Sequence, residues 1–404
     1  MKQDCTMRVQ TYFGGTMAIC LYNGTLLSGF SVMENCAILI DEGKIIDVFS
    51  QKRFNQKHFS SDTKLFDVDG AYISPGLIDT HIHGFNGHGT EDADVESILA
   101  MSKDLAAYGV SAFNPTLYSS DEETLIKSIK AIKDAIGKEQ GAKIMGIHLE
   151  GPFVSPDKAG VQRPETIKGA DTDMMERLWT ASEGTIVNMT VAPEIKGMRE
   201  LALSCLKKGI ILQAGHTNAM YENMVEGMQA GILHSTHLFN AMSQMHHRNP
   251  GAVGAVLIHP EMACEIIADG VHVHPDLLKL LMRDKPIDKI VLVTDALKPT
   301  EQTGDELYAN GEQVVFQDGC FHRKNDGVIA GSALTMIRGV KNLVEYGFPI
   351  GDAIRCASTN PAQIMGYSKK GFLIPGNDGD IIVFDKYFNV LVSIIGGKIK
   401  KNII

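Results

Sequence analysis

The chain has 404 residues, of which 44% are hydrophobic and 21% are charged, which is typical of a soluble globular protein without long disordered segments. Its formal net charge of −10 argues against a general nucleic-acid-binding protein, because such proteins are usually basic. Seven cysteines, an odd number without a CxxC pair, argue against a disulfide framework or a thiolate zinc site and favour a reducing compartment.

The first residues, MKQDCTMRVQTYFGG, lack the apolar segment of a signal peptide. No stretch of the chain approaches the roughly 18 uninterrupted apolar residues that a membrane-spanning helix requires. We therefore expect no membrane partner and a cytoplasmic location.

Both ends of the chain read as short β-strands separated by turns. Near the N-terminus, turns are predicted at Asn23-Gly24 and at Asp41-Glu42-Gly43. Near the C-terminus, residues 371–385 and 389–401 show the same style, with glycine-containing turns. We expect residues 1–73 and 372–404 to form one small β-sandwich domain.

Between these ends, the pattern changes to strands that alternate with helices. Eight candidate strands are found, at residues 76–82, 110–116, 143–150, 185–194, 209–216, 232–240, 264–273 and 289–296. Eight such repeats predict a (β/α)8 TIM-like barrel over residues 74–371. A doubly wound open sheet is the alternative, but no GxGxxG follows the first strand.

One helix of this region has a clear start signal. Ser120 is a candidate N-cap, and Glu123 three residues later completes a capping box. The residues that follow form one apolar stripe at helical spacing, made of Leu125, Ile129, Ile132 and Ile136.

Polar side chains recur at the ends of the predicted strands. His81 and His83 are two residues apart, so on a strand both point to the same face. In a (β/α)8 barrel the chemistry lies at the C-terminal rim of the strands, which is where this set would gather. The remaining members are Thr116, His148, Glu150, Glu194, His216, His237, Asn240, Asp269, His272, His274 and Asp295.

Histidine and carboxylate ligands without cysteine suit zinc or ferrous iron and leave room for a bound water. Such a metal lowers the pKa of its water to about 7 and supplies hydroxide as a nucleophile. A nearby carboxylate such as Asp295 could take the proton and pass it to a leaving group. The residues alone therefore predict metal-assisted hydrolysis, and no GxSxG motif competes with it.

Longer motifs add a family resemblance over nearly the whole chain. PGLIDTHIHG (75–84), VTDA (293–296) and STNPAQIMG (358–366) are similar to the amidohydrolase superfamily. HLEGPF (148–153), HLFNAM (237–242) and RNPG (248–251) are narrower and resemble the N-acetylglucosamine-6-phosphate deacetylases. The resemblance implies hydrolysis of the acetamide of N-acetylglucosamine 6-phosphate to glucosamine 6-phosphate and acetate. It assigns the nucleophile to metal-bound hydroxide and the role of general base, then acid, to Asp295.

The resemblance also implies a metal site. Glu150, His216 and His237 would be the main ligands. Members of the family with a His-x-His pair, such as His81 and His83 here, can hold a second metal, with the glutamate bridging the two. One or two zinc or ferrous ions for each subunit are therefore expected.

For the substrate, the resemblance implies that Asn240 and the backbone at Ala241 bind the sugar phosphate. Arg248 would contact the phosphate in the site of the neighbouring subunit, which implies a homodimer. His272 would contact a sugar hydroxyl, and Ile329, Ala330 and Gly331 would line the sugar pocket.

Two departures from the family pattern leave alternatives open. Gln162 stands where a histidine usually polarises the acetyl carbonyl, although a glutamine amide can also donate a hydrogen bond there. The stretch DALKPT (295–300) replaces a run of small residues. The alternatives are a deacetylase of N-acetylgalactosamine 6-phosphate and a catalytically silent sugar-phosphate-binding barrel. A cyclic-amide hydrolase is less favoured, because Glu150 occupies the place of its bridging lysine.

Overall fold

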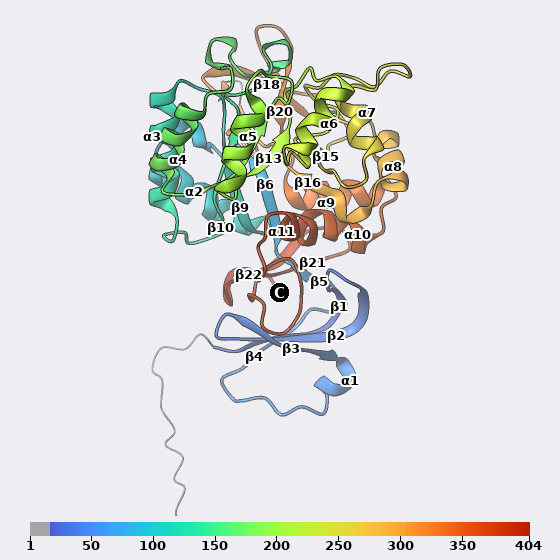
Figure 1. The fold of residues 1–404 in the computed structure, drawn as a ribbon. Coiled ribbons are helices and arrows are strands. Elements are labelled where there is room, and N and C mark those ends of the chain that lie inside the picture. The colour runs from blue at the N-terminus through green and yellow to red at the C-terminus, as the bar shows by residue number, and fades with distance from the viewer. Residues whose placement is uncertain (1–16, 305) are drawn as a thin grey trace, which may run out of the picture.

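A computed structural model of the protein describes residues 17–304 and 306–404. The chain forms a barrel surrounded by helices and, below it in Figure 1, a separate sheet built from both ends of the described chain. That sheet has the order β23-β22-β21-β5-β1-β2-β3, with β4 paired to β1. Its strands are β1 (Ile19–Leu27), β2 (Val32–Asp41), β3 (Lys44–Ser50), β4 (Lys64–Asp67), β5 (Tyr72–Pro75), β21 (Ile381–Phe384), β22 (Val390–Ile395) and β23 (Lys398–Asn402).

The predicted β domain from both chain ends is thus confirmed as a separate sheet domain. Its sequence boundaries, 1–73 and 372–404, stay a prediction, and residues 1–16 lie outside the described residues. One face of the sheet has its own apolar core, which includes Leu21, Ile38 and Ile394. The other face supplies Ile382 and Phe384 to the core of the barrel, so the two domains share buried surface.

The two turns predicted near the N-terminus have different outcomes. Glu42 and Gly43, with φ of 47° and 77°, turn the chain between β2 and β3 as expected. The turn predicted at Asn23-Gly24 is wrong, because β1 continues through it with a bulge. Asn23 adopts a φ of 62°, and its backbone N–H donates to Gln51 Oε1 at 2.8 Å, which holds the bulge within the sheet.

The barrel confirms the predicted fold class. Neighbouring strands pair in parallel in the order β6-β9-β11-β12-β13-β14-β15-β16. Where β16 meets β6, the N–H of Asp295, two residues beyond the end of β16, donates to the carbonyl of His81 in β6 at 2.9 Å. The strands are β6 (Leu77–Ile82), β9 (Val110–Leu117), β10 (Lys143–Ile144), β11 (Ile147–Glu150), β12 (Ile186–Val191), β13 (Ile211–Ala214), β14 (His234–Ser235), β15 (Ala263–Ile267) and β16 (Ile290–Val293).

Several strands end earlier than the sequence predicts. The chain leaves the extended conformation at its polar rim residues, where His216, His237 and Asp295 have φ of 44°, 24° and 50°. Positive φ is costly for residues other than glycine, and such strain is concentrated at functional sites.

Helices cover the outside of the barrel, as Figure 1 shows. The start of α3 (Glu122–Ala135) differs from the prediction, because the N-cap is Asp121 rather than Ser120. The Asp121 side chain accepts the N–H of Thr124 at 2.9 Å, and the predicted apolar stripe is turned towards the barrel. The other helices are α1 (Gln51–Phe54), α2 (Val95–Ala107), α4 (Thr172–Ser182), α5 (Met198–Lys207), α6 (Tyr221–Gln229), α7 (Gly251–Ile258), α8 (Pro275–Asp284), α9 (Met336–Glu345), α10 (Ile350–Ile354) and α11 (Asn360–Ile364).

A small antiparallel sheet that was not predicted follows β16. It contains β17 (Leu307–Ala309), β18 (Glu312–Gln317), β19 (Cys320–Arg323) and β20 (Ile329–Ser332). The sheet is anchored to the rim of the barrel, because the N–H of Ser332 donates to the carbonyl of Asp295 at 2.9 Å. A second short hairpin, β7 (Gly84–Phe85) with β8 (His88–Gly89), follows β6 directly.

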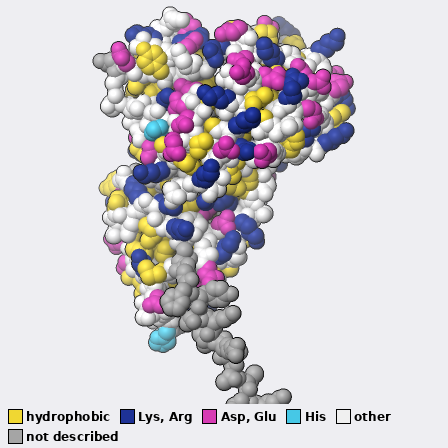
Figure 2. Space-filling view, turned by 90° about the vertical axis from the view of Figure 1, so that its left-hand side faces the viewer, with side chains coloured by type: hydrophobic (Ala, Val, Ile, Leu, Met, Phe, Trp, Pro, Cys, Tyr) yellow, Lys and Arg dark blue, Asp and Glu magenta, His cyan; other side chains and the backbone are white. Residues whose placement is uncertain are grey.

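The surface carries both signs of charge. Figure 2 shows basic and acidic side chains interspersed over this face of the barrel, with smaller apolar areas between them. In the part of the chain that the structure describes, no helix combines the length and apolar character needed to cross a membrane.

Candidate metal centre

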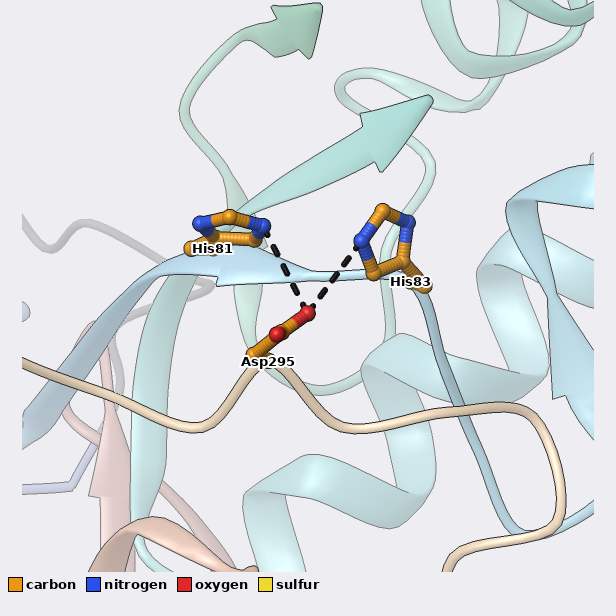
Figure 3. Close-up of side chains that lie close together, drawn as sticks. All are labelled: His81, His83 and Asp295. Atoms are coloured by element: carbon orange, nitrogen blue, oxygen red, sulfur yellow. Dashed lines mark ion pairs between the residues drawn. The ribbon is translucent and has the colours of Figure 1, made fainter. Parts of the chain in front are cut away.

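His81 and His83 lie side by side at the end of β6, as their spacing predicts. Figure 3 shows both rings on the same side of the strand, facing Asp295. Asp295 Oδ1 is 3.5 Å from His81 Nε2 and 3.3 Å from His83 Nε2. All three residues are buried, and together they form one group whose ligand atoms could hold a metal ion.

Glu150, His216 and His237 form a second buried group of this kind. Glu150 Oε1 lies 3.1 Å from the Nε2 atom of each histidine, and the two Nε2 atoms are 3.2 Å apart. β11 supplies the carboxylate, while the histidines follow β13 and β14. Ligand atoms from the ends of β11, β13 and β14 therefore meet at one place.

Glu150 links the two groups. Its Oε2 atom is 3.3 Å from His83 Nε2, and its Oε1 atom is 3.4 Å from His81 Nε2. One carboxylate thus faces both sets of imidazoles, an arrangement that suits a carboxylate shared by two cations.

Three of the four histidine rings are held through the nitrogen that faces away from the centre. The Nδ1–H of His83 donates to the carbonyl of Thr116 at 3.1 Å, and that of His216 donates to the carbonyl of Lys158 at 2.9 Å. His81 donates in the same way to Glu265 Oε2 at 3.0 Å. Such bonds fix the tautomer and leave Nε2 as the ligand atom.

The donor set fits a divalent cation. Imidazole and carboxylate ligands without sulfur are those of hydrolytic zinc and non-haem iron sites. His81 Nε2 is buried and has no hydrogen-bond partner among the described residues, although it points at the shared carboxylate. A buried polar atom without a partner is costly, and a cation would satisfy it.

Burial and the neighbouring histidines together set the pKa of both carboxylates in the site. Burial raises the pKa of Glu150, but the surrounding histidines, led by His216, hold it well below its usual range. Burial acts likewise on Asp295, and His81 and His83 lower its pKa. Both carboxylates are therefore ionised at neutral pH, as metal binding requires.

A cavity of about 280 Å³ opens onto both groups. Its walls include six of the eight residues predicted to bind substrate, namely Asn240, Ala241, His272, Ile329, Ala330 and Gly331. His272 is oriented by Asp269, whose Oδ2 accepts its Nδ1–H at 2.6 Å. Tyr118, which was not predicted, also lines the cavity and stacks on His83 with ring centroids 3.8 Å apart.

Comparison with known proteins places this site in a family. Residues 72–400 match the amidohydrolase family. The chain belongs to the amidohydrolase family. It is 33% identical over 374 residues to the N-acetylglucosamine-6-phosphate deacetylase of Bacillus subtilis (strain 168), covering 91% of this chain and 93% of that protein. It is 31% identical over 408 residues to the Homo sapiens protein of that name, covering 97% and 98%.

Solved structures of proteins with the same name are also similar to this chain over almost its whole length. The crystal structure of the deacetylase of that name from Pasteurella multocida superposes with a TM-score of 0.89 at 29% identity, covering 95% of this chain and all of that one. A variant of the Mycobacterium smegmatis deacetylase, in complex with N-acetyl-D-glucosamine-6-phosphate, superposes with a TM-score of 0.88 at 25% identity, covering 96% and 100%.

Two of the predicted substrate-binding residues of this amidohydrolase do not line the cavity. Gln162 is 1% exposed and lies between two partners instead. Its Nε2 donates to Glu150 Oε2 at 2.5 Å, and its Oε1 accepts the N–H of Ser119 at 2.8 Å. Arg248 lies in an exposed loop, where its guanidinium contacts His247 Nε2 at 2.8 Å. The substrate roles of Gln162 and Arg248 stay predictions.

Three other polar residues predicted at the rim, His148, Glu194 and His274, make hydrogen bonds to the surrounding chain of this amidohydrolase. His148 lies between two threonine hydroxyls, 3.2 Å from Thr116 Oγ1 and 2.9 Å from Thr190 Oγ1. Burial, followed by the charge of His81, lowers its pKa to about 3, so it stays neutral. Glu194 accepts the backbone N–H of Asn218 at 2.7 Å and holds a loop. His274 caps α8.

A belt of buried polar side chains below the metal ligands was not predicted. Asn114 donates to Asn188 at 3.2 Å, Asn188 to Gln213 at 3.0 Å and Gln213 to Glu265 at 2.7 Å. Glu265 then accepts from His81, so the belt ends on a ligand. The available signal was an amide or carboxylate side chain inside each of four strands, β9, β12, β13 and β15, whose other residues are apolar or carry only a hydroxyl.

Proposed function

We propose that this amidohydrolase hydrolyses the acetamide of N-acetylglucosamine 6-phosphate to glucosamine 6-phosphate and acetate. One observation carries the proposal: Glu150 joins two buried ligand groups, with Asp295 beside them, at the floor of a cavity. Relatives that carry the name of this activity match the chain over almost its whole length. Six of the eight substrate-binding residues that the resemblance to these deacetylases implies line the cavity.

Glu150, His216 and His237 would hold one divalent cation, and His81, His83 and Asp295 would hold a second that shares Glu150. The nitrogen and oxygen donors favour zinc or ferrous iron. A bound cation of this kind polarises a carbonyl oxygen and lowers the pKa of water to about 7.

Asp295 is suited to move the proton. Its carboxylate is ionised at neutral pH, because His81 and His83 lower its pKa against the effect of burial. It can accept a proton from the attacking water and then donate that proton to the amide nitrogen. An oxygen–carbon bond forms, the carbon–nitrogen bond breaks, and the products are the amine and acetate.

The rest of the cavity would hold the sugar phosphate. His272, which is fixed by Asp269, would contact a sugar hydroxyl, and residues Ile329 to Gly331 would form an adjacent wall. Asn240 and the backbone at Ala241 would bind the phosphate. Arg248 is outside the cavity of its own chain, which supports the proposal that it serves the site of a second subunit in a homodimer. A cytoplasmic location completes the proposal, supported by seven cysteines without a CxxC pair, which favour a reducing compartment.

The test is acetate release from N-acetylglucosamine 6-phosphate by protein loaded with zinc or ferrous iron. N-acetylgalactosamine 6-phosphate and unphosphorylated N-acetylglucosamine serve as comparison substrates. Faster turnover of the gluco phosphate than of either comparison would support the proposal. Faster turnover of N-acetylgalactosamine 6-phosphate would show that the galacto phosphate is the substrate instead. Binding without turnover in metal-loaded protein would indicate a catalytically silent sugar-phosphate-binding barrel.

Asp295→Asn tests the mechanism in the same assay. We expect kcat to fall at least about a hundredfold, because general acid–base catalysis contributes about 10²- to 10⁴-fold. Asp288→Asn, at an exposed aspartate, is the matched control. Unchanged acetate release by Asp295→Asn would rule out the role of this residue.

A further inference from the structure

A second cavity, of about 220 Å³, adjoins the catalytic cavity. Tyr118 belongs to the walls of both, and its ring stacks on His83. The other walls come from the segment with Thr90 and Glu91, the start of α3, the loop around Arg163 and the turn between β17 and β18, which contains Asn310 and Gly311. We call this space the side chamber.

The side chamber gathers polar atoms that lack partners. In residues 17–304 and 306–404, thirteen buried side-chain nitrogen or oxygen atoms have no hydrogen-bond partner, and five of them belong to residues of this chamber. Two of these residues are more than nine-tenths buried, Tyr118 at 7% and Ser120 at 6% exposure. The five atoms are Glu91 Oε2, Tyr118 OH, Ser120 Oγ, Arg163 Nε and Asn310 Nδ2. Buried polar groups normally have partners, so this concentration points to a ligand.

The chemistry of these atoms favours an anion. Arg163 Nε and Asn310 Nδ2 can only donate, and the hydroxyls of Tyr118 and Ser120 can donate as well. Within the described residues, the Arg163 side chain has neither an ion pair nor a hydrogen bond. A guanidinium together with an amide and hydroxyls matches the two oxygens of a carboxylate.

Glu91 is the one acidic group among the five. Burial raises the pKa of its carboxyl, while the backbone N–H of Asn310 and the charge of Lys298 act in the opposite direction. Its negative charge is therefore partly offset, and its protonated form would add a further donor. The chamber, at about 220 Å³, is also smaller than the catalytic cavity of about 280 Å³ that is proposed to hold the sugar phosphate. A small carboxylate fits these limits better than a sugar phosphate.

We propose that the side chamber binds a small monocarboxylate, and that its occupant in turnover is the acetate released at the neighbouring metal centre. The identity of the occupant rests on the proposed function, whereas the carboxylate site itself rests on the unpaired donors. Arg163 and Asn310 would bind the carboxylate oxygens, and Tyr118 would separate the bound product from the ligands of the metal.

The test measures acetate binding directly, by saturation-transfer NMR on metal-loaded protein. We expect Arg163→Gln and Asn310→Ala each to weaken acetate binding about tenfold, since each removes a hydrogen bond to a charged group. Arg199→Gln, at an exposed arginine, is the control and should bind as the parent does. Asn310 lies in a different segment of the chain from Gln162, which hydrogen-bonds the metal ligand Glu150, so Asn310→Ala also serves if Arg163→Gln disturbs Gln162.

Equal acetate binding by all four proteins would place the anion elsewhere, for instance on the metal, and would overturn the proposal. Absence of acetate binding in the parent protein would overturn it too. A second readout is product inhibition of turnover by acetate, which should be relieved in Arg163→Gln. Acetate binding that depends on Arg163 without any deacetylation would overturn the proposed function and leave the carboxylate site in place.

Discussion

Glu265 Oε2 lies 3.0 Å from His81 Nδ1, and neither residue is exposed to solvent. Burial raises the pKa of Glu265, but His81 and the neighbouring His234 and His148 bring it down to about 2. An ionised carboxylate therefore orients the imidazole so that its Nε2 faces Glu150. Partners of this kind behind a ligand raise its basicity and fix its ring.

We expect Glu265→Gln to weaken cation binding at the His81–His83 group about ten- to a hundredfold, the usual effect of losing a partner behind a metal ligand. Competition with a chelator, followed by metal analysis, measures this directly. Glu261→Gln is the matched control, because Glu261 is exposed. Equal retention of metal by both variants would show that Glu265 does not support the ligand.

Gln162 gives a second prediction, because it holds Glu150 rather than lining the cavity. Gln162→Ala removes a hydrogen bond to a charged group, worth about 1.5–3 kcal/mol. We expect both metal affinity and kcat to fall about tenfold or more, with KM little changed. Metal titration and steady-state kinetics measure these effects, with Gln56→Ala, at an exposed glutamine, as the control.

A different pattern would identify a direct contact between Gln162 and the substrate. In that case Gln162→Ala would keep the metal affinity of the parent protein, while the kinetic constants for the substrate would change. The two readouts together therefore decide between holding Glu150 and polarising the acetyl carbonyl, the role that the family histidine suggested.

Local sequence patterns, namely residue spacing and the alternation of strands and helices, were sufficient to predict the barrel and the position of its polar rim. The two-residue spacing of His81 and His83 correctly indicated that both rings lie on one side of β6. Eight strand–helix repeats were enough to predict the fold class. In that fold the C-terminal ends of the parallel strands meet at one rim, which is why the polar residues at the strand ends were expected to gather there. Strand ends that meet at one rim also predicted that Glu150, His216 and His237 lie close together, as they do in the structure.

Relationships between distant residues were beyond these patterns. Glu265 and His81 are 184 positions apart, and only the arrangement of the barrel strands shows that one orients the other. Likewise, nothing local distinguishes His148, which stays neutral between two threonines, from the histidines beside Glu150. The sequence of the small sheet after β16 did contain a hairpin signal, the pair Asn310-Gly311, and both residues adopt positive φ in the structure. Its strands are short and partly exposed, so their alternation is weak.

The ion pairs of Lys370 are the basis of a prediction of how the stability of the fold depends on pH. Its ammonium lies 2.5 Å from Asp380 Oδ2 and 3.2 Å from Asp378 Oδ2, beside the sheet domain. Burial lowers the pKa of Lys370, but these two carboxylates raise it above its usual value. For Asp378, burial raises the pKa, while Lys44 and Lys370 lower it. Asp380 is only 5% exposed, so removal of the lysine leaves a buried charge without its partner.

We expect Lys370→Met to lower the free energy of unfolding by about 3–5 kcal/mol at neutral pH, as for other broken buried pairs. The part from Asp378 is present above its unfolded pKa of about 3.9 and is lost as the pH falls through its lower folded pKa. The part from Lys370 is present below about 10.4 and is lost as the pH rises through its raised folded pKa.

Chemical denaturation at about pH 7 and about pH 3 tests this prediction. The difference in the free energy of unfolding between the parent protein and Lys370→Met should be smaller at the lower pH. Lys369→Met, at the exposed neighbouring lysine, is the control and should match the parent at both. A difference that does not change with pH would indicate that Lys370 stabilises the fold through packing alone.

Arg248 provides the test of a shared active site. It is exposed and lies outside the cavity of its own chain. We expect Arg248→Ala to raise KM for the phosphorylated substrate about ten- to a hundredfold, the loss of a hydrogen-bonded ion pair, and to leave the unphosphorylated sugar unaffected. Steady-state kinetics with both substrates measure the difference.

Mixing variants then decides which subunit the arginine serves. If Arg248 reaches the site of its partner, a dimer of one Asp295→Asn and one Arg248→Ala subunit contains one complete site. The activity of the refolded mixture should therefore exceed the sum of the two variants assayed alone. A mixture of Arg248→Ala with the double variant Arg248→Ala/Asp295→Asn contains no complete site and is the control. Equal activity of the two mixtures, in protein shown to be dimeric, would mean that Arg248 does not act across the subunit interface.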